Sequence, residues 1–182
     1  MTTTYLNEVD LAAVGALVQK IQADPTKAQT TWKSEVTWGG AFRTTARSRG
    51  FDPIAFDEPP GLGGTNTAPN PVEQLLGALG SCLVIGYAAN ASVAGIELKD
   101  LRIELEGDLD LQTFLGLGDG NAGFSSIGAT VHIEADADDE AIEALHRKVV
   151  SSSPVGHCLS RSVPIEVNLA QALPLHRRND HE

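Results

Sequence analysis

The stretch from Asn70 to Gly95 constrains this chain more than any other part of it. Three helix-start signals stand together at its beginning: Asn70 as N-cap, Pro71 at the first helical position and Glu73 at the third. Apolar and small residues then recur at three- and four-residue spacing on a stripe that includes Cys82, and the other faces are weakly polar too. A helix that is apolar nearly all round is a buried one. The sequence therefore predicts a long buried helix, ended by Gly95, with a thiol near its middle.

Composition narrows the class of protein. The 182 residues suit one domain, and the net charge of −11 disfavours nucleic acid as a partner. Two cysteines are too few for a secreted disulfide framework or a Cys-only zinc site, and no histidine spacing resembles a metal site. Ser81, Asn90 and Ser92 interrupt the best candidate for a membrane span, and the first residues lack the features of a signal peptide. We expect a cytoplasmic protein with no cofactor, no metal and no membrane segment.

Before the central helix, the pattern predicts one helix and a small sheet. Residues 7–22 have helical periodicity and predict an amphipathic helix. Residues 31–38 and 41–46 alternate, which predicts a hairpin with a turn at Gly39 and Gly40. Residues 51–56 predict a third strand. The loop that follows leads directly into the central helix, so it is well placed to form a pocket wall.

After the central helix, alternation predicts strands over 98–109 and 127–135, and a second amphipathic helix covers 138–150. Residues 110–125 are rich in glycine yet carry large apolar side chains, which indicates that they cover a ligand cleft or a partner surface. Residues 163–169 predict a final strand at a sheet edge, because Pro164 cannot donate to a ladder. Alternating strands with inserted helices give an α+β class.

The run PNPVEQLLGALGSC, the preceding DEPPGLGGTNTA and the later SPVGH resemble the OsmC/Ohr family of thiol-dependent hydroperoxide reductases. The resemblance extends over roughly residues 32–168. It implies an OsmC-like fold with antiparallel sheets packed around a long central helix. It also implies an intertwined homodimer with a reactive cysteine at the subunit interface. We accordingly divide the chain into a helical extension (1–28), an OsmC-like domain (29–172) and a polar tail (173–182).

Cys82 falls where this family carries its peroxidatic thiol. Composition alone favours an inert buried cysteine at position 82, and the resemblance reverses this preference. The family's peroxidases have a resolving cysteine directly before a proline, whereas this chain has Ser153 before Pro154. Cys158 lies five residues later, about 140° around a helix from that position. Cys158 is therefore a candidate to form a disulfide with Cys82, or else a packed small hydrophobe.

The resemblance also implies a cation for the thiol. The family's peroxidases use an arginine of the N-terminal sheet; Arg43 aligns best, with Arg47 and Arg49 close by. The alternative is that all three lie on a solvated strand face. The same peroxidases read N-P-E, with the glutamate holding the arginine, whereas Glu73 comes one place later here. Helix capping explains Glu73 without catalysis.

Three functional hypotheses follow from the resemblance. The first is a homodimeric peroxidase that reduces organic hydroperoxides, with Cys82, Cys158, Arg43 and Glu73 as site residues and a dithiol as reductant. The second is a non-peroxidase of the same fold that binds a small apolar molecule, which the serine at position 153 favours. The third is a single-cysteine peroxidase whose sulfenic acid is reduced by an external thiol.

Overall fold

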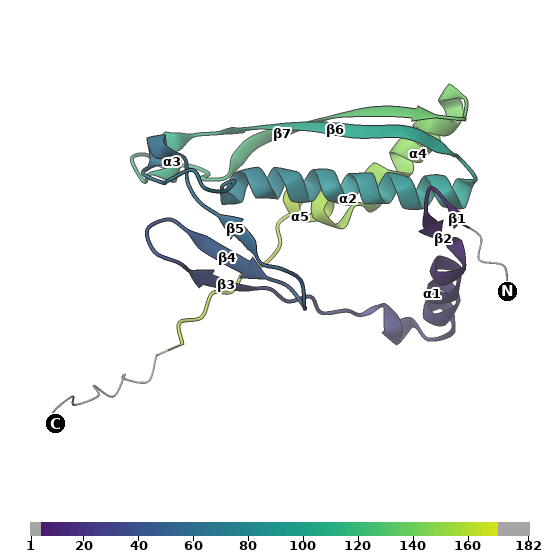
Figure 1. Cartoon of the computed structure of the whole chain (residues 1–182), viewed down its shortest axis with the longest axis horizontal. Coiled ribbons are helices and arrows are strands. Elements are labelled where there is room, and N and C mark those ends of the chain that lie inside the picture. The colour runs from purple at the N-terminus through teal and green to yellow at the C-terminus, as the bar shows by residue number, and fades with distance from the viewer. Residues whose placement is uncertain (1–4, 171–182) are drawn as a thin grey trace.

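The computed structural model describes residues 5–170, and the central helix, α2 (Pro71–Ala94), runs through the middle of it (Figure 1). The helix begins and ends where the sequence predicts. The Asn70 side chain accepts a hydrogen bond from the Glu73 N–H, and Gly95 closes the helix in the left-handed region at φ 75°. That region favours glycine because a Cβ atom would be strained there.

A long antiparallel ribbon covers one side of α2. It pairs β6 (Leu98–Leu109) with β7 (Phe124–Ala135), which extends the expected second strand by three residues at its start. The core lies between this ribbon, α2 and α4 (Asp139–Ser152), and its buried side chains are Leu79, Leu83, Tyr87, Ala91, Ile96, Leu145 and Val149. Burial raises the pKa of Tyr87, whose hydroxyl hydrogen-bonds His146 Nδ1 at the edge of this core.

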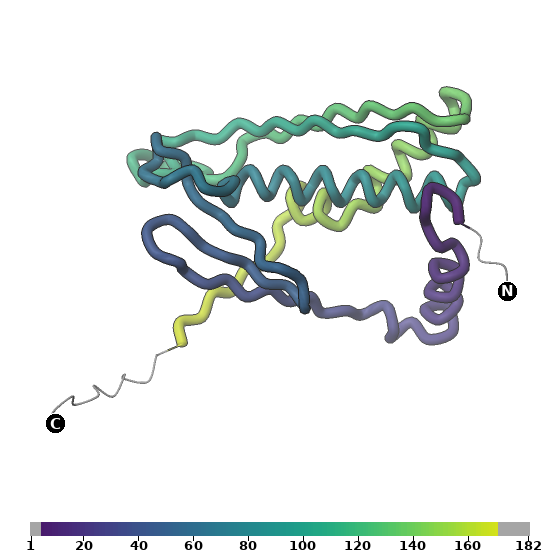
Figure 2. The backbone as a smooth tube through the Cα atoms, viewed as in Figure 1, coloured from purple at the N-terminus to yellow at the C-terminus, as the bar shows by residue number. Residues whose placement is uncertain are grey.

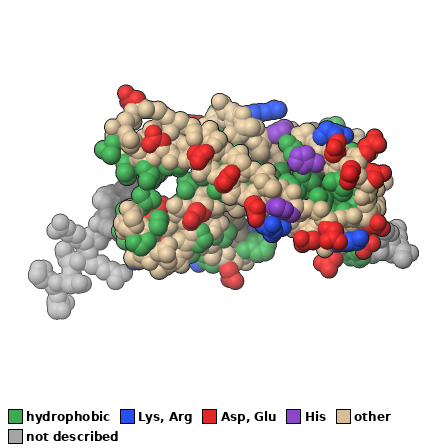
Figure 3. Space-filling view, turned by 90° about the horizontal axis from the view of Figure 1, so that it is seen from above, with side chains coloured by type: hydrophobic (Ala, Val, Ile, Leu, Met, Phe, Trp, Pro, Cys, Tyr) green, Lys and Arg blue, Asp and Glu red, His purple; other side chains and the backbone are tan. Residues whose placement is uncertain are grey.

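The outer face of the ribbon is polar. Glu104 accepts hydrogen bonds from Arg102 and His132, and the Arg102 bond is the first cause that holds the pKa of Glu104 below its ordinary value. Figure 3 looks onto this side of the molecule and shows acidic side chains scattered over it among a few cationic ones. The alternation that predicts the strand therefore also separates a core face from a solvent face.

A three-stranded sheet lies on the other side of α2 (Figure 1). It contains β3 (Glu35–Trp38), β4 (Thr44–Arg47) and β5 (Ile54–Phe56) in that order, all antiparallel. The hairpin is confirmed, but its turn is longer than the expected Gly-Gly pair. It runs from Gly39 to Arg43 and is closed by two backbone hydrogen bonds, from the Gly39 N–H to the Arg43 carbonyl and from the Arg43 N–H to the Gly40 carbonyl. Much of this sheet's apolar surface is exposed, including Val36, Trp38 and Ile54.

The N-terminal segment differs from the expectation. The predicted helix over 7–22 is observed as α1 (Leu11–Ala23), and a small hairpin of β1 (Tyr5–Leu6) and β2 (Val9–Asp10) precedes it. Asn7 and Glu8 form the hairpin turn with φ of 50° and 61°, which is incompatible with a right-handed helix. The helix begins only after Asp10, whose side chain caps the Ala13 N–H. A short 3-10 turn, η1 (Pro25–Ala28), follows it.

The predicted final strand over 163–169 is wrong for the described structure. After α5 (Pro154–Ser160) the chain is extended but pairs with no strand among the described residues. Ile165, Val167 and Leu169 are at least 85% exposed. A strand requires a backbone partner for its N–H and C=O groups, and alternation alone does not supply one. Figure 2 shows this segment leading away from α5 toward the C-terminus. The expected polar tail over 173–182 lies outside the described residues.

One side of α2 remains uncovered. By length and hydropathy α2 would be able to cross a membrane, but buried core helices satisfy the same criterion, and α2 packs on β6, α4 and α5. On the opposite side Ile85 and Val93 are 65% and 67% exposed. The sequence predicts that α2 is buried on all sides. Within a single chain it is buried on one side only.

Candidate functional site

Cys82 lies near the middle of α2 and is half-buried. Its position depends on how closely α2 approaches the ribbon. A Cβ atom on Gly80 would lie 2.7 Å from Leu105 Cδ1. Glycine therefore lets Leu105 of β6 pack closer to α2 than a larger residue at position 80 would. Cys82 itself faces Ser153, the residue that joins α4 to α5.

The polar neighbour of Cys82 is Ser153. The Cys82 Sγ lies 3.4 Å from the Ser153 Oγ, although the two residues are 71 positions apart. Ser153 is only 5% exposed and is the N-cap of α5, where its Oγ accepts a hydrogen bond from the Gly156 N–H at 3.1 Å. The sequence motif predicts no role for Ser153 beyond the replacement of a cysteine, but the Ser-Pro pair is a capping signal that could have placed it at a helix start.

Cys158 is exposed and unpaired, as Cys82 is unpaired. On α5, Gly156 faces α2, because a Cβ atom there would lie 3.9 Å from Leu79 Cδ1. Cys158 is two residues further on, roughly 200° around the helix from that face. Its side chain therefore leaves α5 on the side away from Cys82.

Arg43 closes the turn between β3 and β4. It lines a shallow depression of about 250 Å³ together with residues of β4 and β5. Among the described residues no ion pair or hydrogen bond joins Arg43 to Cys82 or to Glu73. Arg47 ends β4, and the Arg49 guanidinium lies 4.5 Å from the centroid of the Phe51 ring. Within one chain, the structure brings none of the three arginines into contact with the thiol.

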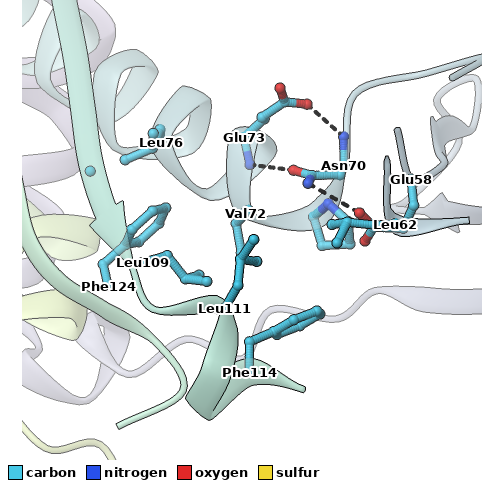
Figure 4. A pocket seen from close by; sticks show the side chains of 12 residues that line it. Glu58, Leu62, Asn70, Val72, Glu73, Leu76, Leu109, Leu111, Phe114 and Phe124 are labelled. Carbon is cyan, nitrogen blue, oxygen red and sulfur yellow. Dashed lines mark hydrogen bonds between the residues drawn. The ribbon is translucent and has the colours of Figure 1, made fainter. Parts of the chain in front are cut away.

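Glu73 forms the capping box at the start of α2. Its carboxylate accepts from the Asn70 N–H at 2.8 Å, and the Asn70 side chain accepts from the Glu73 N–H at 2.9 Å (Figure 4). The capping role is therefore observed directly. The carboxylate is also close to a cleft, because Glu73 and Asn70 are among its lining residues.

That cleft lies between the start of α2 and the end of the ribbon, and its volume is about 440 Å³. Figure 4 shows apolar side chains converging on it from α2, from the ribbon and from α3 (Leu111–Phe114). These are Val72, Leu76, Leu109, Leu111, Phe114 and Phe124. The glycine-rich segment predicted to cover a cleft supplies part of this wall, and the loop before α2 supplies Glu58 and Leu62. Cys82 is not among the residues that line it.

Asp57, which is not among the residues predicted from the sequence, fixes that loop. Its side chain is 1% exposed and accepts hydrogen bonds from Glu58, Thr65 and Thr67. The Thr65 hydroxyl, at 2.5 Å, is the first cause that holds the pKa of Asp57 far below its ordinary value. The available signal was a Thr-x-Thr pair in a loop of Gly and Pro, since such hydroxyls and amides converge on a nearby carboxylate. Asp57 thereby anchors the wall of the cleft that includes 3-10 turn η2 (Pro60–Leu62).

Comparison with known proteins gives a consistent result. The family model described as OsmC-like protein matches residues 64–168. The solved structure of an OsmC-like protein from Mycoplasma pneumoniae superposes with a TM-score of 0.63 at 19% identity, covering 72% of this chain and 89% of that one. No curated protein matches the sequence significantly.

Two further solved structures have the same fold. An organic hydroperoxide resistance protein OsmC from Legionella pneumophila gives a TM-score of 0.56 at 20% identity, over 72% of this chain and 91% of that one. An organic hydroperoxide resistance protein from Elizabethkingia anophelis, with thiocyanate bound, gives 0.53 at 18% identity, over 71% and 89%. These likenesses establish the α+β fold.

Proposed function

Because the chain belongs to the OsmC-like protein family, we propose that it is a thiol-dependent peroxidase that reduces organic hydroperoxides through Cys82. The observation that carries the proposal is the setting of this thiol. It is half-buried on the central helix, with the Ser153 hydroxyl 3.4 Å from its sulfur. Reactive thiols occupy such partly accessible sites with polar neighbours, whereas a thiol sealed in an apolar core is inert.

The chemistry requires Cys82 as its thiolate. The sulfur attacks the distal oxygen of the hydroperoxide, the O–O bond breaks, and the products are a sulfenic acid on Cys82 and an alkoxide that takes a proton to leave as the alcohol. A thiol then attacks the sulfenic sulfur and releases water as the mixed disulfide forms. A second thiol reduces this disulfide and restores Cys82.

We propose that the working unit is a homodimer and that Arg43 supplies the cation. The exposed apolar side chains of the three-stranded sheet and of α2, such as Trp38 and Ile85, support a second copy as the cover for these surfaces. Arg43 has no ion-pair partner among residues 5–170, so none of these described residues neutralises its charge. Glu73 holds the helix start, and with it the edge of the apolar cleft.

The first experiment compares the reduced wild type with Cys82→Ser and Cys158→Ser, using cumene hydroperoxide as substrate and dithiothreitol as reductant. We expect Cys82→Ser to abolish peroxide consumption because the nucleophile is lost. Cys158→Ser is the matched control: it removes the exposed thiol and should retain the wild-type rate. Peroxide consumption by Cys82→Ser at the wild-type rate would contradict the proposal.

A second candidate function rests on the cleft. A volume of about 440 Å³ walled by aromatic and aliphatic side chains suits an apolar small molecule, and Cys82 does not line it. In this function the chain binds the molecule without redox chemistry. The same assay separates the two functions, because a binding protein would consume no hydroperoxide with any dithiol, whether or not Cys82 is present.

A further inference from the structure

We propose that Ser153 is a positioning residue for the Cys82 sulfur, and that it makes this protein a single-cysteine centre that an external thiol reduces directly. This inference rests on the proposed peroxidase function and deepens it. It assigns the Ser153 hydroxyl as a hydrogen-bond partner of the sulfur and a thiol from solution as the reductant. Neither role requires Cys158.

The direction of the hydrogen bond follows from the groups around the serine oxygen. A hydroxyl has one proton to donate and two lone pairs that accept. The Ser153 Oγ already accepts from the Gly156 N–H at 3.1 Å, and the Cys82 Sγ lies 3.4 Å away. A thiolate has no proton, so in the ionised state only the hydroxyl can donate. The bond then has a charged acceptor, which makes it stronger than the same bond to the neutral thiol.

The serine is held in place for this role. Ser153 is 5% exposed and begins α5, and its Oγ is fixed by the cap. A Cβ atom on Gly156 would lie 3.1 Å from that oxygen and 3.2 Å from the Ser153 Cβ, so the serine fits closely against a residue with no side chain. A side chain fixed by packing presents its donor without first losing rotamer freedom.

The same geometry separates Cys158 from the reaction. Gly156 faces α2, and Cys158, roughly 200° further around α5, is exposed. The hydroxyl that lies 3.4 Å from the reacting sulfur belongs to a serine, which cannot form a disulfide. After oxidation, the sulfenic acid on Cys82 therefore keeps its oxygen until a thiol arrives from solution. That thiol takes the place of the hydroxyl group on sulfur and water leaves; a second thiol then releases Cys82 as a free thiol together with the oxidised reductant.

The test compares Ser153→Ala with Ser152→Ala, in a Cys158→Ser background so that only Cys82 reacts. Ser152 is the matched control, because it is exposed at the end of α4 and its hydroxyl bonds only the Lys148 carbonyl. The readout is the rate of alkylation by iodoacetamide across a range of pH, which reports the ionised fraction of the sulfur. We expect Ser153→Ala to be alkylated about tenfold more slowly near neutral pH, because a hydrogen bond to a charged group is lost. Equal rates in the two variants would overturn the role of Ser153.

Mass spectrometry after one equivalent of cumene hydroperoxide tests the source of the reducing thiol in the chain with both cysteines. We expect the wild type to gain one oxygen on Cys82, trapped by dimedone, and to form no Cys82–Cys158 bond. Ser153→Cys places a second sulfur next to Cys82, and this variant should instead lose two hydrogens as a disulfide forms. A Cys82–Cys158 disulfide in the wild type would overturn the single-cysteine centre. If no variant reacts with peroxide, the peroxidase function fails, and the alkylation rates still decide the role of Ser153.

Discussion

Asp57 shows how one buried charge can shape a loop at the scale of the residue. Its two oxygens receive hydrogen bonds from the backbone or hydroxyl groups of Glu58, Thr65 and Thr67. These donors favour the ionised form, so the pKa in the folded protein lies below the value of about 3.9 in an unfolded chain. The stability that Asp57 contributes is therefore complete above about pH 4 and is lost as the pH falls toward the folded pKa.

We expect Asp57→Asn to lower the melting temperature at pH 7, because the amide presents N–H donors to groups that are themselves donors. The difference from the wild type should shrink as the pH is lowered below about 4, because the Asp57 carboxyl of the unfolded chain takes up a proton there while the folded carboxylate stays ionised, which favours unfolding of the wild type alone. Thermal unfolding measured from pH 7 to pH 3 checks this. Asp52→Asn, an exposed neighbour, serves as the control. Equal melting temperatures for wild type and Asp57→Asn at pH 7 would refute the anchoring role.

At the scale of the element, the N-terminal hairpin is attached to the body by the hydrogen bonds of Asn7 and by one bond from the Ser92 hydroxyl to the Leu6 carbonyl at 2.8 Å. The Asn7 amide donates to the Ser92 hydroxyl and the Ile96 carbonyl at 3.0 and 2.9 Å, and its carbonyl oxygen accepts from the Leu98 N–H at 2.8 Å. It thus joins β1–β2 to the end of α2 and the start of β6. The helix α1 that follows has no buried residue of its own.

Replacing Asn7 by alanine should release this hairpin. The Ile96 carbonyl and the Leu98 N–H lose their partner, and an unsatisfied buried group costs about 1–3 kcal/mol. Since the bond from the Ser92 hydroxyl to the Leu6 carbonyl remains but loses its Asn7 neighbour, we expect local opening of the hairpin rather than global unfolding. Hydrogen exchange should become faster over residues 5–23 and stay unchanged in α4. The control is Asn121→Ala, whose side chain caps only the nearby Gly123 N–H in an exposed loop. Unchanged exchange over 5–23 would show that other contacts hold the hairpin.

At the scale of the whole molecule, the ribbon and the three-stranded sheet differ in how closely they pack on α2. The ribbon, α4 and α5 pack on it directly and bury Leu79, Leu83 and Tyr87. The three-stranded sheet lies on the other side and leaves Trp38 74% exposed, while α2 leaves Ile85 65% exposed on its uncovered side. Both surfaces carry large apolar side chains, and monomeric proteins rarely expose contiguous apolar patches of great size.

A charge placed on this uncovered surface tests the proposed dimer. We expect the wild type to sediment as a dimer, and Ile85→Asp to sediment as a monomer at micromolar concentration, because a carboxylate would be buried without a partner. Val150→Asp is the control, since Val150 is also exposed but lies on α4, away from this side of α2. Circular dichroism confirms that each variant is folded. A wild type that sediments as a monomer would remove the dimer from the proposal.

For the candidate site, the sequence indicates individual residues better than it indicates the contacts between them. Cys82 could be selected from the sequence because the motif around it is specific, and the capping of α2 by Glu73 follows from residues three positions apart. The Ser153 contact could not, since it joins positions 71 residues apart and depends on how α5 lies against α2. For the same reason, helical spacing alone could not decide whether Cys158 faces the thiol.

The sequence alone determined those elements whose signals are local: the bounds of α2 from Asn70 and Gly95, the strand over 98–109 from its alternation, and the α+β class. Such signals act within a turn or between neighbouring residues, so they need no knowledge of the rest of the chain. Only the tertiary structure decided that residues 7–10 belong to a hairpin, that 163–169 form no described strand, and that a serine lies beside the thiol. Each of these depends on contacts between residues distant in sequence. The fold decides which groups bond the Asn7 amide, whether a strand pairs with residues 163–169, and which side chain lies beside the Cys82 sulfur.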